Sequence, residues 1–167
     1  MEKILYFSRA GENYVNGAIR NLEIGNTEIV ARMIHEITNA EMFKIDPVTA
    51  YSSDYNSCIK EAQDDKKRDA RPELKSYPNL DNIDTVYLGY PNYWGTMPMA
   101  LFTLLEHFDF TGKRILPFCT HEGSGMGTSV SDIRNLCPDA MVEEGFAIRG
   151  AEVAKVKEQV QDWLAGR

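Results

Sequence analysis

Residues 85–95 read Thr-Val-Tyr-Leu-Gly-Tyr-Pro-Asn-Tyr-Trp-Gly, an apolar run followed directly by a short aromatic loop. The run from Thr85 to Tyr90 is short, apolar and closed by a proline, which is typical of a strand buried on both faces. The loop from Pro91 to Gly95 then places a tyrosine beside a tryptophan. Aromatics exposed at a strand's end predict either a wall for a planar ligand or a hydrophobic plug over the core.

Strand-like and helix-like segments alternate along the rest of the chain. Further apolar runs predict strands at residues 3–7, 41–45, 114–119 and 141–148. Helical spacing of apolar residues predicts helices at residues 27–38, from residue 51 into the charged stretch 61–71, and at residues 97–108, 128–136 and 153–164. Thr96 is the expected N-cap of the third helix, with Pro98 in its first turn.

This alternation predicts an α/β fold, in which a five-stranded and mostly parallel sheet lies between two helix layers as a three-layer sandwich. We expect a single domain over residues 1–167. Pro117 would remove a ladder hydrogen bond from an interior strand, so we expect that strand to end or bulge there. Gly145 leaves the register of the last strand open.

The composition fits a globular protein, because 43% of its 167 residues are hydrophobic. The net charge of −7 argues against a general nucleic-acid binder. No apolar stretch is long enough to cross a bilayer and no signal-peptide pattern opens the chain, so we expect a cytoplasmic protein. Cys58, Cys119 and Cys137 are odd in number and widely spaced, which predicts neither a disulfide framework nor a metal site.

Ligands of such sheets bind beyond the carboxyl ends of the strands, which here are followed by the loops 8–26, 91–96 and 120–128. The first loop opens with Ser8-Arg9-Ala10-Gly11 and ends with Gly25-Asn26-Thr27-Glu28 at a helix start. Unpaired N–H groups, hydroxyls and a glycine that permits close approach suit an anion or a phosphate. The other interpretation is that Asn26 or Thr27 is only the N-cap and Gly25 only turns the chain.

The Ser8 loop and the Gly-Asn-Thr-Glu helix start together resemble the FMN-phosphate loop of the flavodoxin family. The resemblance implies phosphate contacts from Ser8, Ala10, Asn26 and Thr27, with Gly25 allowing close approach. In that family the loop is usually short, so residues 11–24 look like an insertion between the two halves of the motif. We expect this long polar loop to act as a lid over part of the cofactor, with Tyr14 as the contact residue. Arg9 matches no motif position.

The other two loops extend the resemblance over the whole chain. Of these two, the first, 91–96, resembles the loop that stacks an aromatic on the flavin. The second, 120–128, resembles the loop that supplies backbone groups to the ring edge. The implied flavin contacts are Pro91, Asn92, Tyr93, Trp94 and Gly95 in the first, and Thr120, His121, Glu122, Gly123, Ser124 and Gly125 in the second. The resemblance also implies the strand order 2-1-3-4-5.

The function implied is an FMN-binding redox protein that carries electrons between a reductase and an acceptor, as a monomer or homodimer. An alternative on the same fold is an NAD(P)H-dependent FMN or quinone oxidoreductase, in which case the partner is a small molecule. A phosphoacceptor receiver domain is disfavoured, because Tyr90-Pro91 stands where an aspartate is needed. We expect no metal, no nucleic-acid or membrane partner, and no catalytic side chain: Cys119 has no evident base beside it and fits a small buried strand residue.

Overall fold

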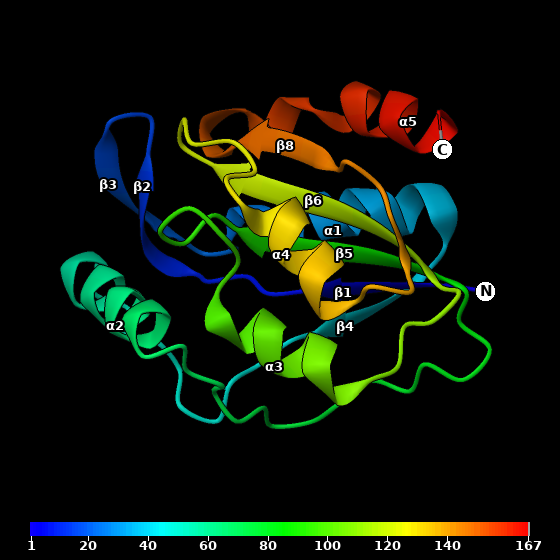
Figure 1. Ribbon diagram of the computed structural model, residues 1–167. Coiled ribbons are helices and arrows are strands. Elements are labelled where there is room, and N and C mark those ends of the chain that lie inside the picture. The colour runs from blue at the N-terminus through cyan, green and yellow to red at the C-terminus, as the bar shows by residue number, and fades with distance from the viewer. Residues whose placement is uncertain (167) are drawn as a thin grey trace.

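The central strand of the sheet is β5 (Thr85–Pro91), as the apolar run predicted. The structure, a computed structural model, describes residues 1–166 (Figure 1). β1 (Glu2–Tyr6) lies between β5 and β4 (Glu41–Lys44), and β6 (Arg114–His121) lies on the other side of β5. The outer neighbours of β6 are β7 (Met141–Val142) and β8 (Phe146–Arg149). All these pairs are parallel, and with β7 and β8 counted as one interrupted strand the predicted order 2-1-3-4-5 is confirmed.

Helices cover both faces of this sheet, which confirms the three-layer fold (Figure 1). One buried cluster lies under α3 (Met99–His107) and α4 (Ser129–Leu136) and contains Leu88, Leu101 and Ile133. The other lies under α1 (Asn26–Thr38) and α5 (Lys157–Ala165) and contains Ile4, Ile34 and Val160. Both clusters are almost fully closed to solvent, so the sheet is a rigid base for the loops at its carboxyl end.

Strand β6 continues through Pro117 without ending or bulging, so the expectation that the strand would end or bulge there was wrong. β6 pairs with β5 through Pro117, which lies opposite Leu88. The N–H of Glu143 donates to the carbonyl of Ile115 at 2.9 Å, which shows that alternate residues of β6, Pro117 among them, face the fifth strand. That strand is interrupted at residues 143–145, beside Pro117. The interruption of the fifth strand therefore compensates for the N–H group that Pro117 lacks, and β6 continues without a bulge.

Some helix boundaries also differ from the expectation. α2 (Tyr55–Lys67) begins after Tyr51 and is capped by Asp54. Pro98, not Thr96, precedes α3, and the Thr96 hydroxyl donates instead to Asp132. The last helix is two pieces, a 3-10 helix η1 (Gly150–Lys155) followed by α5. Within residues 1–166 no helix is long and apolar enough to cross a membrane.

The segment after β1, which was expected to be a long polar loop, is an ordered β-hairpin. β2 (Gly11–Val15) and β3 (Ala18–Leu22) pair in antiparallel register through a turn at Asn16-Gly17. Both turn residues have positive φ, 51° and 84°, as a tight hairpin turn requires, and Asn-Gly is the dipeptide that favours it. The hairpin rises at the same end of the sheet as α2, at the left of Figure 1.

Candidate functional site

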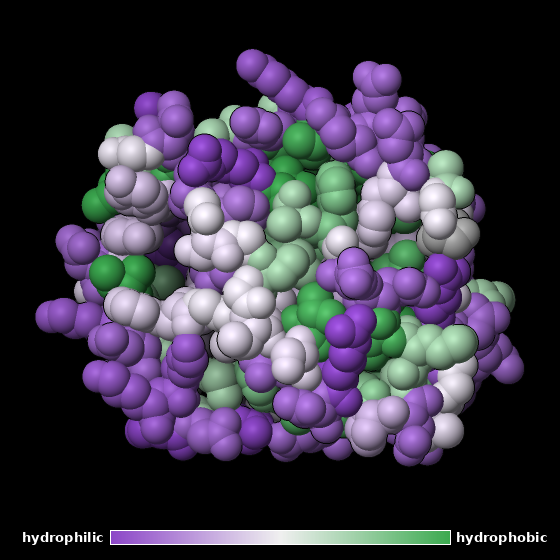
Figure 2. All heavy atoms as spheres, turned by 45° about the horizontal axis from the view of Figure 1, so that its top comes forward, coloured by the Kyte–Doolittle hydropathy of each residue, from purple (hydrophilic) through white to green (hydrophobic). Residues whose placement is uncertain are grey.

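A cavity of about 370 Å³ opens at the carboxyl end of β1, β5 and β6, within the size range of small-molecule sites. The hairpin and α2 stand on either side of this end of the sheet in Figure 1, and in Figure 2 the surface is hollowed at its left. The residues that line the cavity are Ser8, Arg9, Asn13, Tyr14, Asn26, Thr27, Tyr55, Cys58, Ile59, Ala62, Pro91, Asn92, Tyr93, Trp94, Gly95, Thr120, His121, Glu122, Ser124 and Gly150.

All three loops expected from the sequence contribute to this lining. The predicted residues that line it are Ser8, Asn26, Thr27, Pro91, Asn92, Tyr93, Trp94, Gly95, Thr120, His121, Glu122 and Ser124. Four predicted residues are outside the lining: Ala10, Gly25, Gly123 and Gly125.

One end of the cavity is a polar cradle at the start of α1. Gly25 precedes the helix without a side-chain cap, so neither Asn26 nor Thr27 is the N-cap. The buried hydroxyls of Thr27 and Thr120 lie 2.8 Å apart, and Ser8 Oγ accepts from the N–H of Glu28 at 3.1 Å. These hydroxyls and the remaining N–H groups at the helix start, those of Asn26 and Thr27, form an arrangement suited to a phosphate.

Gly25 brings the two halves of this cradle together across the hairpin. A Cβ at this position would lie 2.2 Å from Ser8 Oγ and 2.7 Å from the carbonyl oxygen of Arg9. Such distances are far below van der Waals contact, so the helix start can approach the end of β1 only with glycine here. The hairpin therefore leaves the cradle intact, because its ends meet at this contact.

The other end of the cavity is built by the loops after β5 and β6, which are held together by Asn92. The side-chain N–H of Asn92 donates to the backbone carbonyl of Gly125 at 2.9 Å, and its side-chain oxygen Oδ1 accepts from the N–H of Gly95 at 2.9 Å. The N–H of Thr128 donates to the carbonyl of Gly95 at 2.7 Å. The two loops thus form one continuous wall rather than two independent segments.

The two adjacent aromatics of this wall have different environments. The ring of Tyr93 packs edge-on against Phe7 and Tyr51, with centroid distances of 5.8 and 5.9 Å. Trp94 has positive φ, is 45% exposed and donates its indole N–H to the carbonyl of Ile59 at 2.8 Å. Both rings therefore line the cavity, but Tyr93 also packs on the core, while Trp94 is the more exposed of the two.

His121 and Glu122 stand at the end of β6 with defined hydrogen bonds. His121 Nδ1 accepts from the N–H of Gly123 at 2.9 Å, which leaves Nε2 as the donor of the neutral ring. Burial and the nearby Arg149 lower the pKa of His121, which favours that neutral form. Glu122 Oε2 accepts from the N–H of Asn16 at 3.0 Å, while its Oε1 is buried with no hydrogen-bond partner in residues 1–166.

The orphaned Oε1 of Glu122 faces a position that the sequence did not reveal. A Cβ on Gly150 would lie 2.4 Å from this oxygen and 2.6 Å from Asn26 Nδ2. Glycine at position 150 thus lets the backbone pack closely against Glu122 and Asn26, where any side chain would clash with both. Nothing in the sequence around Gly150 pointed to it, because the contact joins segments far apart in the chain.

The remaining lining residues come from the hairpin and α2, which the sequence did not connect with each other. Tyr14, the expected hairpin contact, does line the cavity, and its ring lies 6.1 Å from that of Tyr55. Arg9, for which no motif position was found, also lines it. Cys119 lies outside the lining, and burial raises the pKa of its thiol to about 12, so it is not poised as a nucleophile. Within the described residues no cluster of side chains could hold a metal ion.

Solved structures with this fold include several flavoproteins. A candidate flavoprotein from Bacteroides eggerthii DSM 20697 has a TM-score of 0.77 and 26% identity, covering 99% of this chain and 96% of that chain. A flavoprotein of Lactobacillus acidophilus NCFM in complex with FMN has a TM-score of 0.63 and 20% identity, covering 92% and 96%. A flavodoxin of Fusobacterium nucleatum bound to FMN has a TM-score of 0.54 and 13% identity, covering 99% and 95%.

At such identities the last two matches establish the fold alone. No curated protein sequence matches the chain significantly. The flavodoxin family, however, matches residues 22–166, which is most of the chain and includes α1 and the loops after β5 and β6. Together with the parallel sheet in the order 2-1-3-4-5 and the cavity at its carboxyl end, this match shows that the chain belongs to the flavodoxin family.

Proposed function

We propose that the protein binds FMN in this cavity and transfers electrons between a reductase and an acceptor. The observation that carries the proposal is one cavity with an anion cradle at one end and an exposed tryptophan at the other. FMN has the matching polarity, with a phosphate at one end and a flat apolar ring at the other. The FMN complexes of the two structural neighbours with low identity support the same ligand.

The residues present fit this cofactor. The N-terminus of α1 with Ser8, Thr27 and Thr120 would hold the phosphate. Trp94 would cover a face of the ring, and the loop that begins at His121 would supply its backbone groups to the ring edge. Bound FMN supplies the one- or two-electron chemistry, and the protein orients it and sets its potential.

Changing Trp94 to alanine is expected to weaken FMN binding by about 1–3 kcal/mol, the scale of a lost aromatic contact at a ligand. Fluorescence titration of the apoprotein with FMN measures the change. Tyr77→Ala is the matched control, because Tyr77 is also partly exposed but stacks on His107, away from the cavity. Unchanged FMN affinity in Trp94→Ala would show that this aromatic is not the ring wall.

The electron-carrier proposal predicts that NADPH alone reduces the bound flavin slowly and that a flavodoxin reductase accelerates the reduction by orders of magnitude. The reason is that a carrier lacks a built site for the nicotinamide. Stopped-flow absorbance of the flavin measures both rates. Rapid bleaching by NADPH alone would favour the alternative function, an NADPH-dependent oxidoreductase.

A further inference from the structure

One charged side chain of the cavity, that of Arg9, is not explained by the phosphate cradle. Arg9 lines the cavity, is half-buried and directly follows Ser8 of the cradle. The two side chains nevertheless go in different directions. Ser8 Oγ accepts from the N–H of Glu28 in α1, whereas the guanidinium of Arg9 reaches the loop before α2. Arg9 therefore has a different place in the cavity from the groups that suit a phosphate.

Backbone carbonyls hold the guanidinium of Arg9 in one orientation. Its Nε and Nη2 donate to the carbonyl of Ser52 at 3.0 and 2.7 Å, and its Nη1 donates to the carbonyl of Glu12. A carbonyl group carries no net charge, so these bonds fix the guanidinium without neutralising it. The positive charge of Arg9 is therefore in place before any ligand binds.

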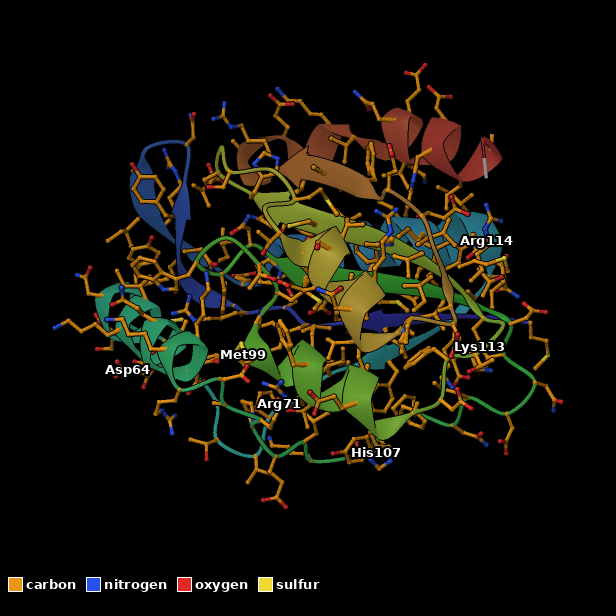
Figure 3. The ribbon with its side chains drawn as sticks, viewed as in Figure 1. Asp64, Arg71, Met99, His107, Lys113 and Arg114 are labelled. Carbon is orange, nitrogen blue, oxygen red and sulfur yellow. The ribbon has the colours of Figure 1, made fainter. Side chains whose placement is uncertain are left out.

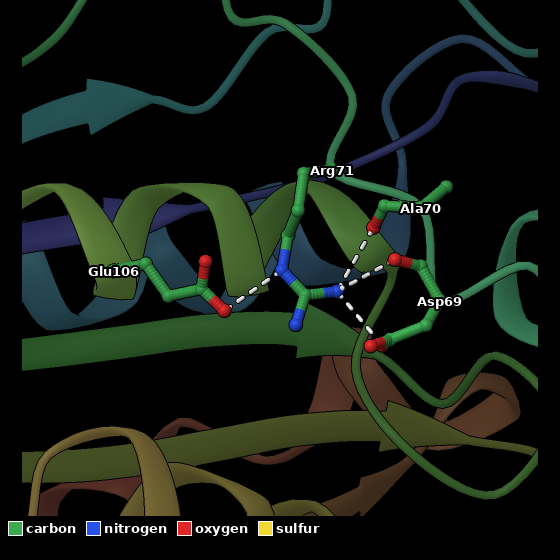
Figure 4. Close-up of polar contacts among 4 residues, drawn as sticks. All are labelled: Asp69, Ala70, Arg71 and Glu106. Carbon is green, nitrogen blue, oxygen red and sulfur yellow. Dashed lines mark hydrogen bonds and ion pairs between the residues drawn. The ribbon is translucent and has the colours of Figure 1, made fainter.

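The charge of Arg9 is not paired with a carboxylate, unlike the charges of Arg71 and Arg114. Arg71 donates to Glu106 at 2.8 Å (Figure 4). Half-buried Arg114 pairs with Glu143 at 2.8 Å and lies at the right of Figure 3, at the opposite end of the sheet from the hairpin. Within residues 1–166, no ion pair joins Arg9 to an acidic side chain. A half-buried cation of this kind favours negative charge in the space next to it.

The first turns of α2 connect Arg9 with the aromatic wall that would cover the flavin ring. Trp94 donates its indole N–H to the carbonyl of Ile59, the residue after Cys58 in α2, and all three line the cavity together with Arg9. Burial raises the pKa of Cys58 and of Tyr93, and in both cases the charge of Arg9 opposes the rise. Arg9 is therefore within electrostatic range of the wall at the ring end of the cavity.

Two carboxylates on this side of the cavity accept from backbone N–H groups instead of pairing with Arg9. Glu12 Oε1 accepts from the N–H of Tyr55 at 2.8 Å. Asp54, the N-cap of α2, accepts from the N–H of Ser57 at 2.9 Å. These bonds to Ser57 are the main cause that lowers the pKa of Asp54, and the charge of Arg9 adds a smaller effect. Asp54 is exposed, so water screens its charge more than that of half-buried Arg9, which is only partly offset inside the cavity.

We infer that Arg9 raises the reduction potential of FMN in this cavity by stabilising the negative charge that the flavin gains on reduction. The role rests on the proposed function, because it requires FMN to bind here. Reduction by two electrons from the donor, with one proton taken from water, leaves the flavin with one negative charge more than before. A fixed, half-buried cation at the ring end favours that charge, and the effect acts through space without a direct contact.

The test is a redox titration of the FMN-loaded protein with dithionite, followed by flavin absorbance. Because binding and reduction are linked, the potential of bound FMN depends on the ratio of the affinities for oxidised and reduced FMN. Arg9→Gln is expected to weaken the binding of reduced FMN about 10-fold more than that of oxidised FMN, which lowers the two-electron potential by about 30 mV. Arg9→Met, also uncharged, should lower it by the same amount. Arg9→Lys keeps the charge and should retain most of the wild-type potential.

Arg114→Gln is the matched control, because Arg114 is also half-buried but lies outside the cavity, and it should leave the potential unchanged. A wild-type potential in both Arg9→Gln and Arg9→Met would overturn the role of Arg9. Equal loss of affinity for oxidised and reduced FMN would overturn it as well, since that is the result of a contact with the phosphate. A drop in Arg9→Lys as large as in Arg9→Gln would refute the charge as the cause. Failure of the wild-type protein to bind FMN would instead overturn the proposed function.

Discussion

Gly127→Ala is expected to lower FMN affinity by roughly 10- to 100-fold and the free energy of unfolding by about 2–4 kcal/mol. A Cβ on Gly127 would lie 2.0 Å from the carbonyl oxygen of Gly95 and 2.6 Å from its carbonyl carbon. The clash is with backbone, so no side chain can rotate away from it. Relief requires the loop after β6 to move away from the loop after β5, which breaks the wall between them.

The backbone conformation of Gly127 adds to this cost, because its φ of 55° is unfavourable for alanine. Gly112→Ala separates the two effects. Gly112 also has positive φ, 76°, but a Cβ there would meet no atom within 4 Å, and the residue is outside the cavity. Calorimetry and FMN titration on both variants give the comparison. Equal losses in the two variants would mean that the contact between the loops is unimportant for FMN binding.

Gly89→Ala is expected to destabilise the fold by about 1–3 kcal/mol, as overpacking of a closed core does. Gly89 lies in the middle of β5, and a Cβ there would lie 2.1 Å from Cζ and 2.3 Å from Cε2 of Phe118. Phe118 is fully buried among Ile4, Ile148 and Trp163, so its ring has no free space to enter. Urea unfolding measures the effect.

A double variant identifies the cause of this destabilisation. If the Phe118 ring is what the new methyl group meets, Phe118→Leu should cost less in the Gly89→Ala background than in wild type. Gly166→Ala is the control, because the nearest atoms there are 3.6 and 3.8 Å away, at ordinary contact distance. Simple additivity of the Gly89 and Phe118 substitutions would contradict this packing argument.

The fold and the three loops could be predicted because they depend on local sequence patterns. Apolar runs such as Thr85–Tyr90 specify buried strands, and the helix start at Asn26 has its own signal. The hairpin also had a local signal, Asn16-Gly17 between two short strands, which the polarity of the segment obscured. The expectation of a strand end or bulge at Pro117 was wrong because the missing N–H group affects the neighbouring strand. That strand is interrupted at residues 143–145.

The contacts that the sequence could not reveal join distant segments through backbone atoms. Arg9 is oriented by the carbonyl of Ser52, and Gly150 makes room beside Glu122 and Asn26. A carbonyl group is present at every residue, so no residue type in the sequence marks these partners. The same holds for α2, whose place beside the hairpin follows from tertiary packing and not from its own charge pattern.

The central claim is that this cavity holds FMN with its phosphate at the start of α1. Parallel titration of the apoprotein with FMN and with riboflavin, which lacks the phosphate, tests it most directly. We predict one FMN bound per chain and a riboflavin affinity lower by roughly 100-fold or more, since several N–H and hydroxyl donors would lose a charged acceptor. No binding of FMN, or equal affinity for the two flavins, would contradict the account.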